Sequence, residues 1–277
     1  MKSLYENIND SINYLHVQHN HPKVDFHLHA GFEIYFLVSG DINYFVEKKV
    51  YQINYGDLII TNNHEIHKPN FLSDKLYDRI TLHFNPSITA HFSSPLFNLL
   101  YCFTNRPKGE QNKISLSDKQ LEAVLRLFNK IEQTYISPKD GDEILKLNYL
   151  IELLVYINRI FINSSYNDET QNMPPKLISI LDFIDNNLEG DLSLSALEKK
   201  FFIDKFYLSR IFKKSTGSTI HDYIVYKRIS KAKILLSEGF SVTESCYKSG
   251  FNDYSNFLKI FKRTVGVSPG KYTLPLY

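Results

Sequence analysis

The strongest constraint on this chain is a repeat near its C-terminal end. Residues 207–217 read YLSRIFKKSTG and residues 256–266 read NFLKIFKRTVG, 49 residues later. The Ile-Phe-Lys triplet and the final glycine are identical, and two further basic positions keep their charge. A repeat with a fixed offset indicates that one structural unit occurs twice. Any fold of this part of the chain must therefore hold two copies of the same unit.

Each copy is predicted to be a helix of about three turns with defined ends. Asp204 and Asp253 precede the copies at the same offset, and each is a good N-cap because its carboxylate can accept free backbone N–H groups. Gly217 and Gly266 stand where a helix end favours a residue that tolerates positive φ. Apolar residues three and four positions apart give each helix one buried face.

A shorter helix is expected before each copy, at Leu194–Lys200 and at Val242–Ser249, and Gly250 supplies the second turn. Helix, short turn and second helix with a basic face is the helix-turn-helix arrangement, whose second helix fits a major groove. Between the copies, His221–Ser237 is predicted to be a helix roughly 25 Å long. Such a rod could hold two recognition helices about one DNA turn, roughly 34 Å, apart. A purely structural helical bundle is the alternative, but the duplicated basic faces favour DNA.

Positive charge is concentrated around the repeat. Residues 174–277 carry 16 Lys and Arg against 10 Asp and Glu, a net charge of +6, and residues 1–173 carry 16 against 20, a net charge of −4. This asymmetry is expected if only one end of the chain meets phosphates, although a solvated helical surface would also produce it. Cys102 and Cys246 lie far apart without a CxxC motif, which fits a reducing compartment and excludes a zinc-finger argument.

The first third of the chain alternates apolar and polar residues in short runs, with turn residues between them. The predicted strands are Glu33–Val38, Ile42–Val46, Val50–Ile53, Leu58–Thr61 and Arg79–Phe84. Their close spacing indicates a small antiparallel barrel or sandwich. Two amphipathic helices are expected at 121–135 and 144–161, separated by Pro138 and Gly141. They could cover the sheets or pair with a second copy of the protein.

The polar stretch at 163–175, NSSYNDETQNMPP, lacks periodicity and ends in two prolines, so it is interpreted as an interdomain linker. We therefore expect an α+β chain of two domains. The first, at 1–165, is a sheet domain that binds an effector and dimerises; the linker covers 166–175; and the second, at 176–277, holds the two helix-turn-helix motifs.

At these residues the chain resembles the AraC/XylS family of transcription regulators, most closely in GFNDYSNFLKIFKRTVGVSPGKY at Gly250–Tyr272. The resemblance implies base-facing residues on both recognition helices: Phe206, Ser209 and Arg210 on the first, and Tyr254, Ser255, Asn256, Leu258 and Lys259 on the second. The basic residues better placed for phosphates are Lys205, Lys213, Lys214, Lys262 and Arg263. Arginine can pair bidentately with guanine, whereas phosphate contacts give salt-dependent affinity without sequence choice.

Two departures from the family pattern fall on the shorter helices. Where a small residue is expected to pack one helix on the next, this chain has Glu198 in the first motif and Cys246 in the second, and Ser245 replaces an aliphatic residue. A buried glutamate is costly unless it is paired. The first motif is therefore expected to dock differently, and the second is the better match.

The segment HLHAGFEIYFLVSG places His27, His29 and Glu33 in an H-x-H-x3-E pattern, and His67 follows later. This resembles the cupin barrel, in which such residues can hold a metal from inside. The second cupin motif is only partly kept, so the sequence favours a polar wall of an effector pocket, with a metal site and ordinary core or edge histidines as the alternatives. The candidate effector residues are His27, His29, Glu33, Tyr35 and His67. Tyr44 and Tyr55 could also line the pocket or belong to ordinary core.

We therefore expect a transcription regulator, by resemblance an activator, in which a cupin-like β-barrel domain binds a small molecule such as a sugar and shifts the DNA-binding arrangement. The expected partners are double-stranded DNA, the effector, a second copy of the chain and RNA polymerase. No cofactor, metal, membrane segment or secretory signal is expected, which indicates a cytoplasmic protein. A metal-dependent cupin enzyme with an appended helical domain, and a regulator controlled by a protein partner, are the alternatives.

Overall fold

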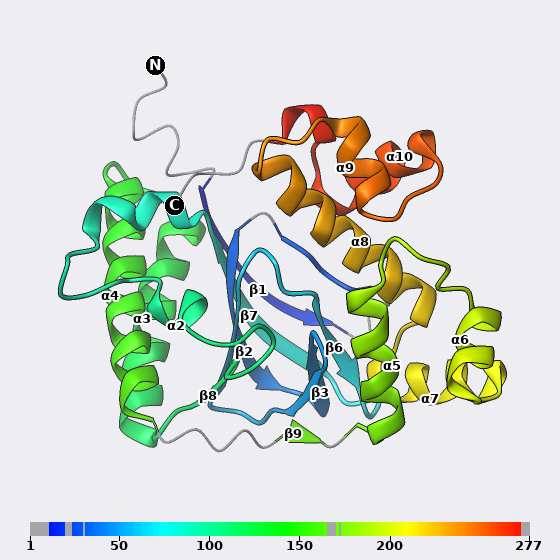
Figure 1. Ribbon diagram of the computed structural model, residues 1–277. Helices are drawn as coiled ribbons and strands as arrows, with labels where there is room; N and C mark the ends of the chain where they lie inside the picture. Colours follow the sequence, from blue (N-terminus) through cyan, green and yellow to red (C-terminus); the bar gives the residue numbers. More distant parts are fainter. Residues whose placement is uncertain (1–10, 20–23, 30, 165–169, 172, 273–277) are drawn as a thin grey trace.

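The computed structural model describes residues 11–19, 24–29, 31–164, 170–171 and 173–272 (Figure 1). Two antiparallel sheets form the N-terminal part, and helices alone form the C-terminal part, so the expected α+β class is confirmed. No helix of the described residues is long and apolar enough to cross a membrane.

The first sheet has the strand order β1-β7-β2-β5-β8 and the second has the order β6-β3-β4-β9. The strands of the first sheet are β1 (Ile12–His19), β2 (Phe32–Ser39), β5 (Asp57–Thr61), β7 (Tyr77–Phe84) and β8 (Lys113–Ser115). Those of the second are β3 (Ile42–Val46), β4 (Lys49–Gln52), β6 (His67–Phe71) and β9 (Thr170–Gln171). The domain is cupin-like, as predicted, but its two sheets face each other as a sandwich and do not close into one barrel.

The five predicted strands are confirmed as β2, β3, β4, β5 and β7, with ends shifted by at most two residues. Four further strands, β1, β6, β8 and β9, were not predicted. β6 (HKPNF) contains a proline, and β8 and β9 are too short to show alternation. These segments are strands because they pair with neighbouring strands in the folded chain.

The first sheet has an unusual distribution of polarity, which strand β7 shows most clearly. Ile80, Leu82 and Phe84 pack in the cluster formed with helices α3 (Asp118–Ile136) and α4 (Asp142–Asn163), on the outer face of the sheet. The intervening residues, Arg79, Thr81 and His83, therefore point toward the second sheet, because side chains alternate along a strand. The space between the sheets consequently contains polar side chains, which is the setting of a binding pocket.

The C-terminal helices follow the predicted plan. They are α5 (Pro175–Asn186), α6 (Leu194–Phe201), α7 (Lys205–Thr216), α8 (Ile220–Ser237), α9 (Val242–Lys248) and α10 (Tyr254–Val265). Smaller elements are η1 (Pro86–Phe92), α2 (Tyr101–Thr104) and η2 (Pro269–Lys271). Helix α8 runs as a rod between the two motifs, with α6 and α7 at one end and α9 and α10 at the other (Figure 1).

The predicted helix ends of the repeat are confirmed. The Asp204 carboxylate accepts the Tyr207 backbone N–H at 2.8 Å, and the Asp253 carboxylate accepts the Asn256 backbone N–H at 2.8 Å. Gly217 (φ 71°) and Gly266 (φ 87°) end α7 and α10 in the left-handed conformation. The two copies therefore share their local geometry as well as their sequence.

Helix α8 is docked on the sheet domain through a shared apolar cluster. Phe26, Phe45 and Ile66 belong to the same cluster as Tyr223 and Ile224 of α8. The Phe26 ring centroid lies 6.0 Å from that of Tyr223. Burial of these side chains from both parts fixes the rod against the second sheet.

Part of the predicted linker is also attached to the sheet, since Thr170 and Gln171 pair with Tyr51 and Val50. The rest of the predicted linker includes residues 165–169 and 172, which lie outside the described residues. The domain limits of 1–165 and 176–277 stay predictions.

The turn between α9 and α10 supplies a test of the packing. Gly250 has a φ of 96°, and a Cβ there would overlap the carbonyl oxygen of Leu188. We expect Gly250→Ala to lower the free energy of unfolding by more than ~2 kcal/mol, since the clash adds to backbone strain of ~1–2 kcal/mol. Gly266→Ala is the matched control, because φ is 87° but nothing lies within 4 Å of an added Cβ. Urea unfolding of both variants measures the difference; equal losses would contradict this packing.

Candidate DNA-binding helices and effector pocket

Helix α7 presents its predicted DNA-contacting residues to solvent. Phe206, Arg210 and Lys213 are exposed, and Lys205 and Ser209 are half-buried. Phe206 is 74% exposed, so its ring is free to contact another molecule. The opposite face, with Leu208 and Phe212, is buried in the core. The face required for groove contacts is thus the free face of the helix.

Helix α10 repeats this arrangement at the other end of the rod. Tyr254, Ser255, Asn256, Lys259 and Lys262 are all exposed, and Leu258 is half-buried. Phe257 and Phe261 form the buried side. Lys214 of α7 and Arg263 of α10, predicted for phosphates, are exposed as well. An exposed basic helix face is what contact with a DNA backbone requires.

Glu198 does not disturb the first motif as the sequence suggested. Its carboxylate is half-buried and accepts the backbone N–H of Lys205 at 3.1 Å. It therefore satisfies a free donor at the start of α7, where a negative charge is also favoured by the helix dipole. The cost expected for a buried, unpaired glutamate is absent. Cys246 is buried in the second motif, as expected, and the nearby Ser245 hydroxyl is buried with no hydrogen-bond partner in the described part of the chain.

The pocket of the sheet domain lies between the two sheets and has a volume of about 130 Å³. Its lining is Leu15, Val24, His27, His29, Glu33, Tyr44, Pro69, Arg79, Thr81 and His83. The Tyr44 hydroxyl donates to Glu33 Oε1 at 3.2 Å. The pocket therefore combines one buried carboxylate with imidazole, guanidinium and phenol groups, a lining suited to a small polar molecule.

Glu33 is the centre of this pocket. Its Oε2 atom lies 2.9 Å from His29 Nε2, 2.8 Å from His83 Nε2 and 3.2 Å from His67 Nε2. Burial raises the pKa of Glu33, but the imidazoles of His83 and His67 outweigh this effect and hold its pKa well below the ordinary value. Burial also lowers the pKa of His27 to about 4 and lowers that of His29. The carboxylate is therefore ionised at neutral pH.

The structure brings together four of the five predicted effector residues. His27, His29 and Glu33 line the pocket, and His67 contacts Glu33 from a fully buried position. Tyr35 is not a lining residue: it is buried in a separate cluster, where its hydroxyl lies 2.7 Å from that of Tyr77. Whether these residues bind an effector stays a prediction.

Sequence reasoning missed His83, Arg79 and Thr81, which all come from β7. The signal that could have identified them is their alternation, since three polar residues at i, i+2 and i+4 share one face of a strand. Alternation alone does not tell which face of the strand lies inside, so these residues were not singled out. In addition, Tyr55 is 57% exposed and lies outside the pocket, whereas Tyr44 lines it.

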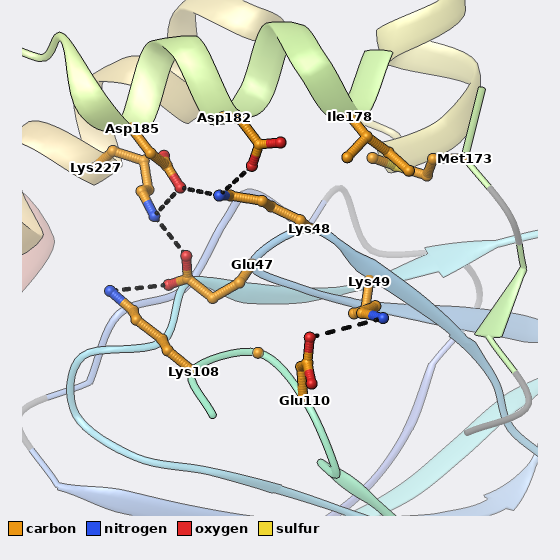
Figure 2. A pocket seen from close by; sticks show the side chains of 11 residues that line it. Glu47, Lys48, Lys49, Lys108, Glu110, Met173, Ile178, Asp182, Asp185 and Lys227 are labelled. Carbon is orange, nitrogen blue, oxygen red and sulfur yellow. Dashed lines mark hydrogen bonds and ion pairs between the residues drawn. The ribbon is translucent and has the colours of Figure 1, made fainter. Parts of the chain in front are cut away.

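A second cavity of about 380 Å³ lies between the sheet domain and the helical domain. It is lined by Glu47, Lys48, Lys49, Lys108, Gly109, Glu110, Met173, Ile178, Asp182, Asp185 and Lys227. Figure 2 shows that its charged groups already pair with one another, both across the two domains and within each of them. The cavity is therefore better described as a charged interdomain contact than as a site with a free charge for a ligand.

The ion pairs of that contact connect the β3–β4 turn to α5 and α8. Lys227 Nζ lies 2.5 Å from Glu47 Oε2 and 3.0 Å from Asp185 Oδ2, and Lys48 Nζ lies 3.0 Å from the same Asp185 oxygen (Figure 2). Burial alone would raise the pKa of Glu47. The charges of Lys227 and Lys108 outweigh this effect and lower the pKa to about 2. These contacts join the sheet domain directly to α8, the helix between the two helix-turn-helix motifs.

Comparisons with known proteins agree with both parts of this description. Residues 12–154 match the family described as AraC-like ligand binding domain, and residues 197–274 match the family described as helix-turn-helix domain. An uncharacterized HTH-type transcriptional regulator from Staphylococcus aureus (strain COL) is 21% identical over 238 residues, 86% of this chain and 30% of that protein. The Msm operon regulatory protein of Streptococcus mutans serotype c is 26% identical over 181 residues, 65% of this chain and 60% of that protein. The chain thus spans about 30% of the staphylococcal relative.

Two solved structures are similar over different lengths. The apo form of a ToxT variant from Vibrio cholerae is 14% identical, with 95% of this chain and 98% of that chain covered and a TM-score of 0.39. The C-terminal domain of the two-component response regulator yesN from Fusobacterium nucleatum is 32% identical, with 34% of this chain and 93% of that chain covered and a TM-score of 0.33.

Proposed function

The chain belongs to the AraC family of helix-turn-helix transcription regulators, and from that premise we propose that it binds specific DNA sequences through α7 and α10. The observation that carries this proposal is the duplicated helix with a free basic face, present at both ends of α8. We further propose that a small molecule bound between the sheets controls this binding, and that the chain has no catalytic role.

In this proposal the two recognition helices enter successive turns of one major groove. Arg210 is the side chain best suited to choose a base, because its guanidinium can pair bidentately with guanine. Asn256 can pair with adenine in the same way. The lysines at the ends of both helices neutralise phosphates and set the position of the domain on the duplex.

Coupling between the pocket and the DNA-binding helices would run through α8. Lys233 is fully buried, and its ammonium donates to the carbonyl oxygens of His29 at 3.0 Å and Asn63 at 2.6 Å. His29 lines the effector pocket, and Asn63 lies in the loop between β5 and β6. A ligand that moves the His29 segment would thus alter a contact made by the rod, which gives the population shift a physical route.

The remaining partners are proposals of the same kind. Exposed Ile136 on α3 and exposed Ile144, Leu145 and Ile162 on α4 could form a homodimer contact. RNA polymerase is the partner expected of an activator, a sugar is the proposed effector class, and the cytoplasm is the proposed location.

The DNA-binding part is tested by selecting sites for the full chain from a pool of random-sequence duplexes at moderate salt. We expect enrichment of a site with two conserved segments about one helical turn apart. Recovery of unrelated sequences after repeated rounds would contradict sequence-specific binding.

The docking of α8 predicts a pH effect. Burial, with Lys108 nearby, lowers the pKa of Lys233 to about 7, well below its ordinary value. The unfolded chain therefore binds one more proton than the folded chain above pH 7, so this lysine makes stability rise as pH increases from 7 toward 10. His64 also faces Lys233, but burial lowers its pKa to about 4, so it does not titrate in this range.

We expect urea unfolding to show that the free energy of unfolding of Lys233→Met, relative to that of the wild type, falls by ~3 kcal/mol from pH 7 to pH 9.5. Lys231→Met is the control. Lys231 lies on the same helix as Lys233, but it is partly exposed and pairs with Glu189. Parallel curves for the wild type and Lys233→Met would show that Lys233 is not buried and that α8 is not docked.

A further inference from the structure

Three imidazole nitrogens converge on one carboxylate oxygen inside the pocket. The Nε2 atoms of His29, His83 and His67 all lie 2.8–3.2 Å from Glu33 Oε2. His29 Nε2 is buried and makes no hydrogen bond to the described part of the chain, despite this short distance. His29 Nε2 is therefore held beside the carboxylate at 2.9 Å without a well-directed hydrogen bond, and three imidazoles share one carboxylate oxygen.

The same atoms fit a metal ion well. The ligand atoms of His29, Glu33 and His83 lie within 4.8 Å of one another. Around a tetrahedral ion with bonds of ~2.1 Å, neighbouring ligand atoms are roughly 3.4 Å apart. The separations of the three Nε2 atoms from Glu33 Oε2 are slightly shorter than this, so a small outward movement of the rings would admit an ion beside the carboxylate.

His67 is prepared as a fourth ligand. Its Nδ1 atom donates to the carbonyl oxygen of Glu65 at 2.8 Å, which leaves Nε2, 3.2 Å from Glu33 Oε2, as the nitrogen available to an ion once it has lost its proton. Metal-bound histidines typically make such a hydrogen bond with their other nitrogen. The pocket volume of about 130 Å³ leaves room for an ion and a few waters.

We propose that His29, Glu33 and His83, with His67 as the fourth ligand, bind a divalent transition-metal ion. Imidazole and carboxylate ligands suit zinc, cobalt or nickel, whereas magnesium and calcium prefer oxygen ligands alone. The proposal rests on the proposed function, since it names a ligand class for the effector pocket. Metal binding is measured on the protein alone, so its outcome is independent of DNA binding. The proposed site also differs from the H-x-H-x3-E pattern of the sequence, because His83 takes the place that the pattern gives to His27.

The test uses the untagged full chain after treatment with chelator. Co²⁺ is added, and the visible absorption of protein-bound cobalt is followed; Zn²⁺ is then added to displace it. We expect saturation at one ion per chain and complete displacement by zinc. His83→Ala and Glu33→Gln are expected to weaken Co²⁺ binding at least tenfold. His221→Ala, at an exposed histidine on α8, is expected to keep the wild-type affinity, and His27→Ala is expected to weaken binding less than His83→Ala.

Circular dichroism of each variant first establishes that it is folded. If His83→Ala is not folded, Glu33→Gln still tests the site, because it keeps the side-chain volume. Failure of the wild type to bind Co²⁺ stoichiometrically would overturn the proposal, as would loss of binding in His27→Ala with retention in His83→Ala. Binding reduced equally by His221→Ala would identify surface histidines as the ligands and would overturn it too. None of these outcomes bears on DNA binding, which the site selection measures separately.

Discussion

Replacing Arg210 by alanine is expected to weaken binding to the selected DNA site by ~1–3 kcal/mol, roughly 5- to 150-fold, and to relax the sequence preference at one base pair. Arg210 is exposed on the free face of α7, one turn after Phe206 and on the side opposite the buried Leu208 and Phe212. A bidentate contact to guanine is lost on truncation, whereas unrelated DNA loses little. Fluorescence anisotropy with the selected site and a scrambled duplex measures both effects.

Lys213→Ala on the same helix is the matched control, because Lys213 is exposed and is assigned to a phosphate. It should weaken binding to both duplexes by a similar factor and reduce the slope of log affinity against log salt by about 1. If Arg210→Ala weakened both duplexes equally, Arg210 would be a phosphate contact and α7 would not read bases through it.

Glu47→Gln is expected to lower the free energy of unfolding by ~3 kcal/mol, since removing one partner of a buried ion pair leaves the other charge without compensation. The side chains of Glu47 and Lys227 are only 4% and 7% exposed. Glu47, whose own φ is 54°, also accepts the Ile66 backbone N–H at 2.9 Å. Asp185 remains beside Lys227 in the variant, which keeps the expected loss near the lower end for such pairs.

Glu110→Gln provides the comparison within the same cavity. Its partner Lys49 is 3.9 Å away, and the Glu110 side chain is 47% exposed, so the expected loss is below ~1 kcal/mol. Urea unfolding of the two variants at pH 7 measures the difference. Indistinguishable stabilities would mean that the β3–β4 turn does not hold the helical domain in solution.

The helical domain was predictable because its signals are local. Aspartate caps, glycine ends and apolar spacing are each decided within one or two turns, and the repeat showed them twice. Glu198 was the exception, because its acceptance of the Lys205 N–H depends on how two helices meet. The sequence showed that Glu198 departs from the family pattern. It could not show that the Lys205 N–H pairs with Glu198 and so removes the cost of burying an unpaired carboxylate.

The sheet domain was predictable in class but less so in its pocket. The strands were recognised by alternation, yet alternation does not tell which face is inside. His83 was missed because the apolar side of β7 is covered by α3 and α4, so that the polar side faces the second sheet. The interdomain pairs could not be predicted either: Glu47 and Lys227 are 180 residues apart, and nothing local to either residue indicates the other.

The central claim, that α7 and α10 occupy neighbouring turns of one major groove, is tested most directly by methylation interference on the selected site. Two groups of interfering guanines are expected about 10 base pairs apart on one face of the duplex. Arg210→Ala should remove interference at a guanine of one group, and Lys259→Ala should remove it at a guanine of the other. A single group of interfering guanines, or loss in the same group in both variants, would contradict the account.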